Sequence, residues 1–365
     1  MAPIRVLVAD DSITVRKRLV QSLSTDPELE VIAEAADGSA VTELCRRLRP
    51  DVITMDVIMP VMDGVTATEF IMAHCPTPIL VVSAASNRGQ VLPTFDALAA
   101  GAVDVLDKPS GGAVDGAWES KLIAAVKMVS RIKAIKRSSI NRRARVASAS
   151  AKLLEAIVLP VLESEEAAIV AIGASIGGPA AIVKILSQVP TSFPLPILLV
   201  IHVAPEFAAG LVQWIANASK HHSVRVAVNG EPMPRPGHRV ILMAPPDRHL
   251  VVGKGRLWTT DSPQRHLCRP SIDELFESVA RDCGSRAIAC LLTGMGKDGA
   301  RGLLAVRQSG GQTIAQDETS SVVFGMPREA IALDAAQVVA PLEAVAETLC
   351  LMARRRGRDG EAICR

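Results

Sequence analysis

A serine set between glycines, in the stretch from Ile169 to Pro179, is the first place where this sequence could carry out chemistry. The stretch is IVAIGASIGGP, in which an apolar run is followed by a turn around Ser175, by Pro179 and by a helix-like segment at 180–188. This order predicts a buried strand, a tight turn and a helix with proline at or near its first position. Glycines permit the backbone angles of such a turn and leave room above the serine.

Three interpretations of this turn are open from its residues alone. The pattern fits G-x-S-x-G, a turn that exposes a nucleophilic serine. It does not fit G-x-G-x-x-G, because Ser175 stands at the second glycine position. A loop that holds a phosphate on a helix N-terminus, or a strand–helix connection without chemistry, fits the residues about as well.

A base and a carboxylate occur at comparable places farther along the chain. His202 follows the apolar run 196–201, and Asp298 lies in TGMGKDG after the apolar run 286–292. Because the carboxyl ends of parallel strands meet at one edge of a sheet, Ser175, His202 and Asp298 could converge there. A histidine that takes the serine proton, oriented by a carboxylate, would activate the serine as a nucleophile.

The spacing alone does not single out one histidine as the base. It favours His202 about as strongly as all the other histidines taken together, since a histidine at a strand end is often a packed residue without a catalytic role. The others are His74, His221, His222, His238, His249 and His266.

A second chemical cluster is predicted in the first third of the chain. Its polar residues stand at or just past the ends of the apolar runs 4–9, 51–55, 79–82 and 103–106; they are Asp10, Asp11, Asp56, Ser83 and Lys108. Three carboxylates at one sheet edge repel one another and call for a divalent cation, and hard oxygen ligands suit Mg²⁺. A lysine and a serine beside them could contact a phosphoryl group.

Two parallel α/β sheets are the fold that would position these residues. Strands alternate with helices in the first 130 residues, and the later apolar runs continue the same pattern. Two segments, 249–252 and 256–260, predict a hairpin across Gly253-Lys254-Gly255. The segment 271–282 predicts a helix with Ser271 as N-cap and Glu274 completing a capping box.

Composition limits the class of protein. The 365 residues suggest two domains, and the cores must be aliphatic because aromatic residues make up only 2% and tyrosine is absent. Few aromatics also argue against a base-stacking surface for single-stranded nucleic acid. The seven scattered cysteines predict reduced thiols rather than disulfides or a zinc site. Without a signal peptide or a membrane-spanning run, the expected location is cytoplasmic, with no membrane insertion.

A basic segment separates the two predicted domains. From Ser120 to Leu154 there are ten basic residues and no acidic one, and the middle of this segment is rich in Ser, Arg and Ala. We expect a flexible linker over 128–166. A solvated tether is favoured over a nucleic-acid site, and docking on an acidic partner is a third possibility.

The first domain resembles the receiver domain of two-component response regulators over about residues 3–127. The matching motifs are Asp10-Asp11, the block from Asp56 to Gly64, Ser83-Ala84 and Lys108-Pro109. The resemblance implies a flavodoxin-like fold in which Asp56 accepts a phosphoryl group from a chemotaxis-type histidine kinase. It further implies that Mg²⁺ is held by Asp11, Asp56 and the carbonyl of Ile58 with help from Asp10, and that Ser83 and Lys108 sense the phosphate.

The second domain, expected over 167–356, resembles the catalytic domain of the chemotaxis protein-glutamate methylesterases. The matching segments are GASIGGP, VIHVAP, CRPSID, TGMGKDGARGL and AQDETSSVVFGMP. The resemblance implies that Ser175 is the nucleophile, His202 the base and Asp298 the orienting carboxylate, with the N–H of Met295 holding the oxyanion. It implies hydrolysis of glutamate methyl esters, and deamidation of glutamines, on methyl-accepting chemoreceptors, with no cofactor for the esterase reaction.

Two other functions fit parts of the sequence. A DNA-binding response regulator would use the basic linker and Arg354-Arg355-Arg356 against phosphates, and it predicts a helix-turn-helix output domain. A receiver joined to a nucleotide-binding domain would use GASIGG as its phosphate loop, but Gly-x-Gly-x-x-Gly and Gly-Lys-Ser/Thr are both missing. We therefore expect two doubly wound parallel-sheet domains, a receiver and a methylesterase, and no nucleic-acid partner.

Overall fold

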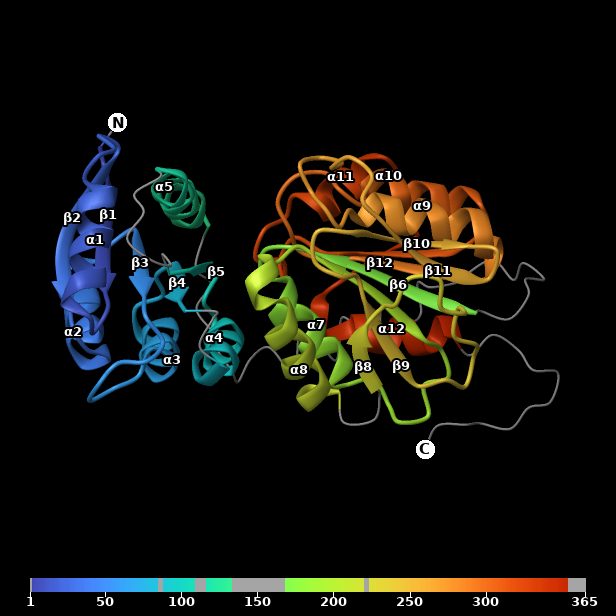
Figure 1. The fold of residues 1–365 in the computed structure, drawn as a ribbon, viewed down its shortest axis with the longest axis horizontal. Coiled ribbons are helices and arrows are strands. Elements are labelled where there is room, and N and C mark those ends of the chain that lie inside the picture. Colours follow the sequence, from blue (N-terminus) through green and yellow to red (C-terminus); the bar gives the residue numbers. More distant parts are fainter. Residues whose placement is uncertain (1, 85–87, 109–115, 133–167, 220–222, 354–365) are drawn as a thin grey trace. The chain divides into compact units, whose positions relative to one another are not determined.

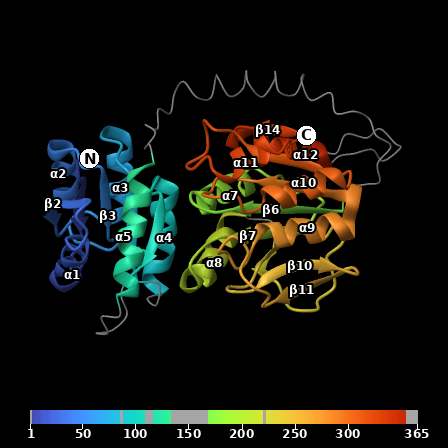
Figure 2. The same cartoon turned by 90° about the horizontal axis from the view of Figure 1, so that it is seen from above.

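The computed structural model describes residues 2–84, 88–108, 116–132, 168–219 and 223–353. The chain divides into two compact units, Met1–Ser139 and Ile140–Arg365. Figures 1 and 2 show the first unit in blue to teal and the second in green to red. Each unit is built on one parallel sheet with helices on both faces, so the predicted fold class is confirmed.

The first unit contains a five-stranded sheet in the order β2-β1-β3-β4-β5, with every pair parallel. The strand order reverses between β1 and β3, and ligands of such sheets bind at that switch point. The strands are β1 (Ile4–Ala9), β2 (Leu29–Ala35), β3 (Val52–Met55), β4 (Ile79–Ser83) and β5 (Asp104–Asp107).

Helices cover both faces of this sheet. α1 packs beside α5, whereas α2, α3 and α4 pack side by side. Ser12, Asp37 and Asp63 cap the first three helices by accepting a backbone N–H, which satisfies one of the donors left free at each helix start. The helices are α1 (Ile13–Leu23), α2 (Gly38–Leu48), α3 (Gly64–His74), α4 (Arg88–Ala100) and α5 (Ala117–Ser130).

The second unit contains a seven-stranded sheet in the order β14-β13-β12-β6-β7-β9-β8, again with every pair parallel. Its switch point lies between β6 and β12. Strands β7, β8 and β9 lie on one side of β6, and the later strands β12, β13 and β14 lie on the other side. The strands are β6 (Ile169–Ala174), β7 (Ile197–Ile201), β8 (Ser223–Val226), β9 (Val240–Met243), β12 (Ala287–Leu291), β13 (Gln312–Gln316) and β14 (Val338–Ala340).

Two groups of helices sandwich this sheet. α7 packs with α8 and α12, and α10 packs with α9 and α11, on opposite faces of the sheet (Figure 1). The core on the α9 side is aliphatic apart from the buried Phe276. The helices are α7 (Gly178–Leu186), α8 (Ala208–Ala218), α9 (Ile272–Cys283), α10 (Ala300–Gln308), α11 (Met326–Ala332) and α12 (Leu342–Ala353), with short 3₁₀ turns at Pro205–Phe207 and Gly284–Arg286.

An antiparallel hairpin, β10 (His249–Gly253) and β11 (Arg256–Thr260), stands apart from the seven-stranded sheet. It confirms the predicted hairpin, although Gly253 belongs to β10 and the turn itself is Lys254-Gly255. The described residues of the second unit form this hairpin and the seven-stranded sheet with its helices, and not the helix-turn-helix domain that a DNA-binding regulator would predict. No helix in the described part of the chain is long and apolar enough to cross a membrane.

The predicted linker lies mostly outside the described residues. Helix α5 continues to Ser130, past the boundary expected at residue 127. Residues 133–167, which hold most of the basic segment, are not among the described ones, and neither are His221, His222 and the arginines at 354–356.

Candidate active site

The serine turn follows β6 as the sequence predicted. Ser175 is 9% exposed, and its N–H donates to the carbonyl of Thr293 at 3.0 Å. Gly177 then takes a φ of +74° as the residue before α7, and a Cβ there would lie 2.6 Å from Val322. Both the backbone angle and the space at this position therefore require glycine, which keeps the turn tight.

The backbone of His202 lies directly beside the serine turn. Strands β6 and β7 pair up to Ala174 and Ile201, and the next N–H, that of His202, donates to the carbonyl of Ala174 at 3.0 Å. Because paired strands run about 5 Å apart, Ser175 and His202 leave the sheet as neighbours. The side chain of His202 is 16% exposed.

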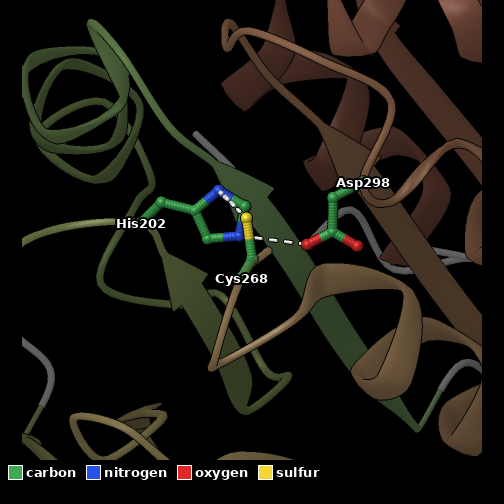
Figure 3. Close-up of side chains that lie close together, drawn as sticks. All are labelled: His202, Cys268 and Asp298. Atoms are coloured by element: carbon green, nitrogen blue, oxygen red, sulfur yellow. Dashed lines mark hydrogen bonds and ion pairs between the residues drawn. The ribbon is translucent and has the colours of Figure 1, made fainter. Parts of the chain in front are cut away.

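Asp298 reaches the same edge from the other side of β6. It lies in the loop between β12 and α10, and its side chain is 2% exposed. Its Oδ2 accepts a hydrogen bond from His202 Nε2 at 3.0 Å (Figure 3). The three loops that follow the adjacent strands β12, β6 and β7 thus carry the predicted carboxylate, serine and histidine.

The start of helix α9 fixes the carboxylate of Asp298. Ser271 Oγ donates to Oδ1 at 2.7 Å, and the backbone N–H groups of Ile272 and Asp273 donate to Oδ2 and Oδ1 at 2.8 and 3.1 Å. Free N–H groups at a helix start stabilise negative charge. The capping role of Ser271 was predicted, whereas its bond to Asp298 was not.

His202 and Asp298 form a tightly coupled ion pair. Burial disfavours the imidazolium, but the hydrogen bond that His202 donates to Asp298 and the contact with Cys268 outweigh it and raise the pKa of His202 from its usual 6.5 to about 9. Burial alone would raise the pKa of Asp298, yet the bonds from His202 and from the start of α9 hold it below its usual value. The pair therefore favours the charged carboxylate and the charged imidazole.

Cys268 is a neighbour of His202 that could not be predicted from the sequence. Its Sγ lies 3.7 Å from His202 Nδ1, and in Figure 3 the sulfur projects onto the imidazole ring. The cysteine stands in CRPSID, a motif that the sequence singled out as a whole without assigning a role to its first residue. His202 is thus held by Asp298 at one ring nitrogen and covered by Cys268 near the other.

Two groups of the predicted site have no protein partner in the part of the chain that the structure describes. No hydrogen bond joins Ser175 Oγ to His202, and the N–H of Met295 donates to no protein group. Hydrogen bonds between a nucleophile and its base are often long in the absence of substrate. The missing bond is therefore compatible with Ser175 and His202 acting together. An N–H without a protein partner is what an oxyanion donor requires before substrate binds.

Two other histidines of the second unit have structural partners. The fully buried His249 has Nδ1 3.1 Å from the N–H of Ser271, from which it accepts, and Nε2 bonded to the carbonyl of Pro263. His266 Nε2 lies 3.1 Å from the buried Asp273. Both therefore bond the segment 263–273, which leads into α9.

In the first unit the predicted carboxylates meet beside the switch point. Oxygens of Asp10, Asp11 and Asp56 lie within 4.8 Å of one another, and Asp10 and Asp56 are almost completely buried. Lys108 Nζ lies 2.8 Å from Asp10 and 2.9 Å from Asp56. Ser83 Oγ accepts a bond from Thr94 at 2.9 Å. A set of oxygen donors in this arrangement is consistent with a Mg²⁺ site.

Burial makes this cluster costly to keep charged. It raises the pKa of Asp10 and of Asp56 above the usual value, although Lys108 partly opposes the rise. Burial would lower the pKa of Lys108, but the two carboxylates outweigh it and raise that pKa. The cluster holds three carboxylates and one lysine, which pairs with Asp10 and Asp56, so a divalent cation would relieve the remaining repulsion.

The chain matches two protein-family models and several curated proteins. Residues 6–114 match the response regulator receiver domain, and residues 170–349 match CheB methylesterase. A protein-glutamate methylesterase/protein-glutamine glutaminase of Nitrosospira multiformis is 45% identical, covering 97% of this chain and 98% of that protein. One from Anaeromyxobacter dehalogenans is 42% identical, covering 95% and 96%.

Solved structures match each unit separately. The CheB methylesterase catalytic domain of Thermotoga maritima is 35% identical and covers 52% of this chain and 100% of that chain, with a TM-score of 0.48. The response regulator domain of Thermotoga maritima CheB is 34% identical and covers 36% and 98%, with a TM-score of 0.33.

Proposed function

The chain belongs to the CheB family of protein-glutamate methylesterases with a receiver domain, and from this premise we propose that Ser175, His202 and Asp298 carry out its hydrolysis. The family activity is that of a protein-glutamate methylesterase/protein-glutamine glutaminase in the adaptation of chemoreceptors. The observation that carries the proposal is the strand order, since β12, β6 and β7 are adjacent and each is followed by one of the three residues.

In the proposed reaction Ser175 Oγ attacks the carbonyl carbon of a glutamate methyl ester. Because Nε2 of His202 is bonded to Asp298, the serine proton would have to go to Nδ1, the nitrogen that Cys268 Sγ contacts at 3.7 Å. The same proton then goes to the departing methanol, and water activated by His202 cleaves the acyl-enzyme. An amide substrate would follow the same path with ammonia as the leaving group, which gives glutamine deamidation.

The oxyanion of the tetrahedral intermediate would be held by the backbone N–H of Met295. This N–H has no protein partner among the described residues, and it follows Gly294, where a Cβ would lie 2.7 Å from the Cβ of Ser175. The close approach keeps the 294–296 loop against the nucleophile. One such donor typically contributes about 3 kcal/mol of transition-state stabilisation.

The pH dependence of ester hydrolysis should report the His202–Asp298 pair. His202 must be neutral to accept a proton, and its pKa is raised to about 9, so kcat/KM should rise with pH through that value. The measurement is a pH–rate profile on p-nitrophenyl acetate, with hydrolysis by Ser175→Ala subtracted. If the acid limb of the profile has its midpoint below the usual histidine pKa of 6.5, the proposed effect of Asp298 on the pKa of His202 is contradicted.

Phosphorylation of the receiver is proposed to control this site. We infer that Asp56 accepts a phosphoryl group from a chemotaxis-type histidine kinase. Mg²⁺ would be held by Asp11, Asp56 and the carbonyl of Ile58, with Asp10 assisting, and the ion would offset charge on the phosphoryl oxygens. Lys108 and Ser83 would contact the phosphoryl group. In this proposal the receiver, over 1–127, restrains the esterase domain, over 167–356, until the receiver is phosphorylated. Residues 128–166 connect the two domains, and the protein acts in the cytoplasm.

Asp56→Asn should remove stimulation by a small phosphodonor, because the amide offers no nucleophilic carboxylate. The measurement is methanol release from methylated receptors with and without the phosphodonor, and chelation of Mg²⁺ should likewise remove the stimulation while sparing the basal rate. Asp51→Asn is the matched control, since Asp51 is exposed and bonds the N–H of Arg5 instead of joining the acidic cluster. Stimulation that survives Asp56→Asn would rule out this residue as the acceptor.

A further inference from the structure

A four-residue turn beside the active site has a backbone that its sequence does not favour. The N–H of Arg265 donates to the carbonyl of Cys268 at 3.1 Å, and the reverse bond is 2.9 Å. The two residues between them, His266 and Leu267, have φ values of +53° and +62°. A tight hairpin turn with both central φ positive normally carries Asn-Gly. Here each side chain adds strain, because left-handed backbone disfavours a Cβ.

The ends of this turn are anchored, and its tip is not. Arg265 makes two bonds to Glu277, at 2.7 and 2.6 Å, and His266 bonds the buried Asp273 at 3.1 Å. Cys268 lies against His202. Between these fixed points Leu267 is 90% exposed, so the strained conformation presents a leucine side chain to solvent.

The exposed leucine borders a groove that reaches the active site. The groove measures about 660 Å³, and Leu267 shares its lining with Asp298 and Cys268. Met295, which is 60% exposed, and Phe324 add apolar lining. Lys297 and Arg328 place positive charge around it, with Glu329 beside Arg328. An apolar and basic groove next to an esterase centre suits a peptide segment that carries apolar and acidic side chains around the ester.

We propose that Leu267 is a specificity-determining residue that seats an apolar side chain of the methylated receptor segment beside the ester. Backbone strain persists where the surrounding structure enforces it. In this turn the strained backbone holds one apolar side chain, that of Leu267, at the mouth of the site. The proposal rests on the proposed function and adds to it how the protein substrate is held. A small ester such as p-nitrophenyl acetate carries no neighbouring peptide side chain for Leu267 to hold, so only the receptor reaction should depend on this residue.

Leu267→Gly in the full-length chain tests the proposal. Glycine adopts this φ without strain, so the thermal midpoint should equal or exceed that of the wild type. Hydrolysis of p-nitrophenyl acetate should be unchanged. For methanol release from membranes with methyl-labelled receptors, kcat/KM should fall about 10- to 100-fold, the range expected when one leucine side chain is no longer buried. Leu267→Asn, which tolerates the same backbone but is polar, should show the same loss.

Lys254→Gly is the matched control. Lys254 also has a positive φ, +53°, in the two-residue turn of the β10–β11 hairpin, and it does not line the groove. It should leave both reactions at the wild-type level. The proposal is overturned if Leu267→Gly and Leu267→Asn keep the wild-type kcat/KM on receptors, or if they slow both substrates equally. Wild-type protein that hydrolyses the small ester but releases no methanol from receptors would instead refute the proposed function.

Discussion

Ser175→Ala is expected to reduce methanol release from methylated chemoreceptors by on the order of 10⁶-fold in kcat, the scale seen when the nucleophile of a serine–histidine–aspartate site is removed. Ser175 supplies the hydroxyl that follows β6 at the switch point. In the variant no serine can attack the ester, so water must attack it directly. Some acceleration should survive, because binding in the groove and the oxyanion donor do not depend on the hydroxyl.

A serine elsewhere on the same supersecondary unit provides the control for this substitution. Ser187 follows α7 and its Oγ bonds the carbonyl of Lys184, so Ser187→Ala removes a hydroxyl at the far end of the helix that Ser175 precedes. It should retain the wild-type rate. Comparable methanol release by both variants would remove Ser175 from the reaction.

Asp298→Asn is expected to lower kcat by about 10⁴-fold, the cost of losing the carboxylate that holds the histidine tautomer. The surroundings of Asp298 consist of donors, namely Ser271 Oγ and the N–H groups of Ile272 and Asp273. An amide has only one accepting oxygen, so its NH₂ must face a donor. The imidazolium also loses its counter-charge, so the pKa of His202 should fall and the acid limb of the pH–rate profile should move to lower pH.

The control is an aspartate at the other end of helix α9. Asp282 accepts the N–H groups of Lys254 and Gly255, so Asp282→Asn also replaces a carboxylate that binds backbone donors. Its kcat and its pH–rate profile should match the wild type. An unchanged acid limb in Asp298→Asn would show that Asp298 does not set the pKa of His202.

The meeting of the candidate residues in each unit could be predicted from the sequence, because the carboxyl ends of parallel strands lie at one edge of a sheet. Asp10, Asp56 and Lys108 follow three strands of one sheet, and the residues after β12, β6 and β7 do the same in the other. An apolar run that ends in a polar residue is visible in the sequence without any knowledge of tertiary contacts. Strand adjacency was not visible, since it depends on which strands pair after the switch point.

The surroundings of the active site could not be predicted by the same reasoning. The bond from Ser271 to Asp298 joins a helix cap to a loop 27 positions away, and the contact of Cys268 with His202 spans 66 positions. Neither has a periodic pattern. The turn at His266-Leu267 was missed for a different reason, because residues that normally signal such a turn are absent from it. Helices α10, α11 and α12 and the three-residue strand β14 were also left unassigned by the sequence reasoning.

The central claim is that Ser175, and not the neighbouring thiol of Cys268, is the nucleophile. The most direct test is reaction of the full-length protein with a fluorophosphonate, followed by mass spectrometry of its peptides. We predict one phosphonyl group for each chain, located on Ser175, with activity lost in proportion to labelling and no labelling of Ser175→Ala. Inactivation with the label on Cys268, or with Ser175 unmodified, would contradict the account.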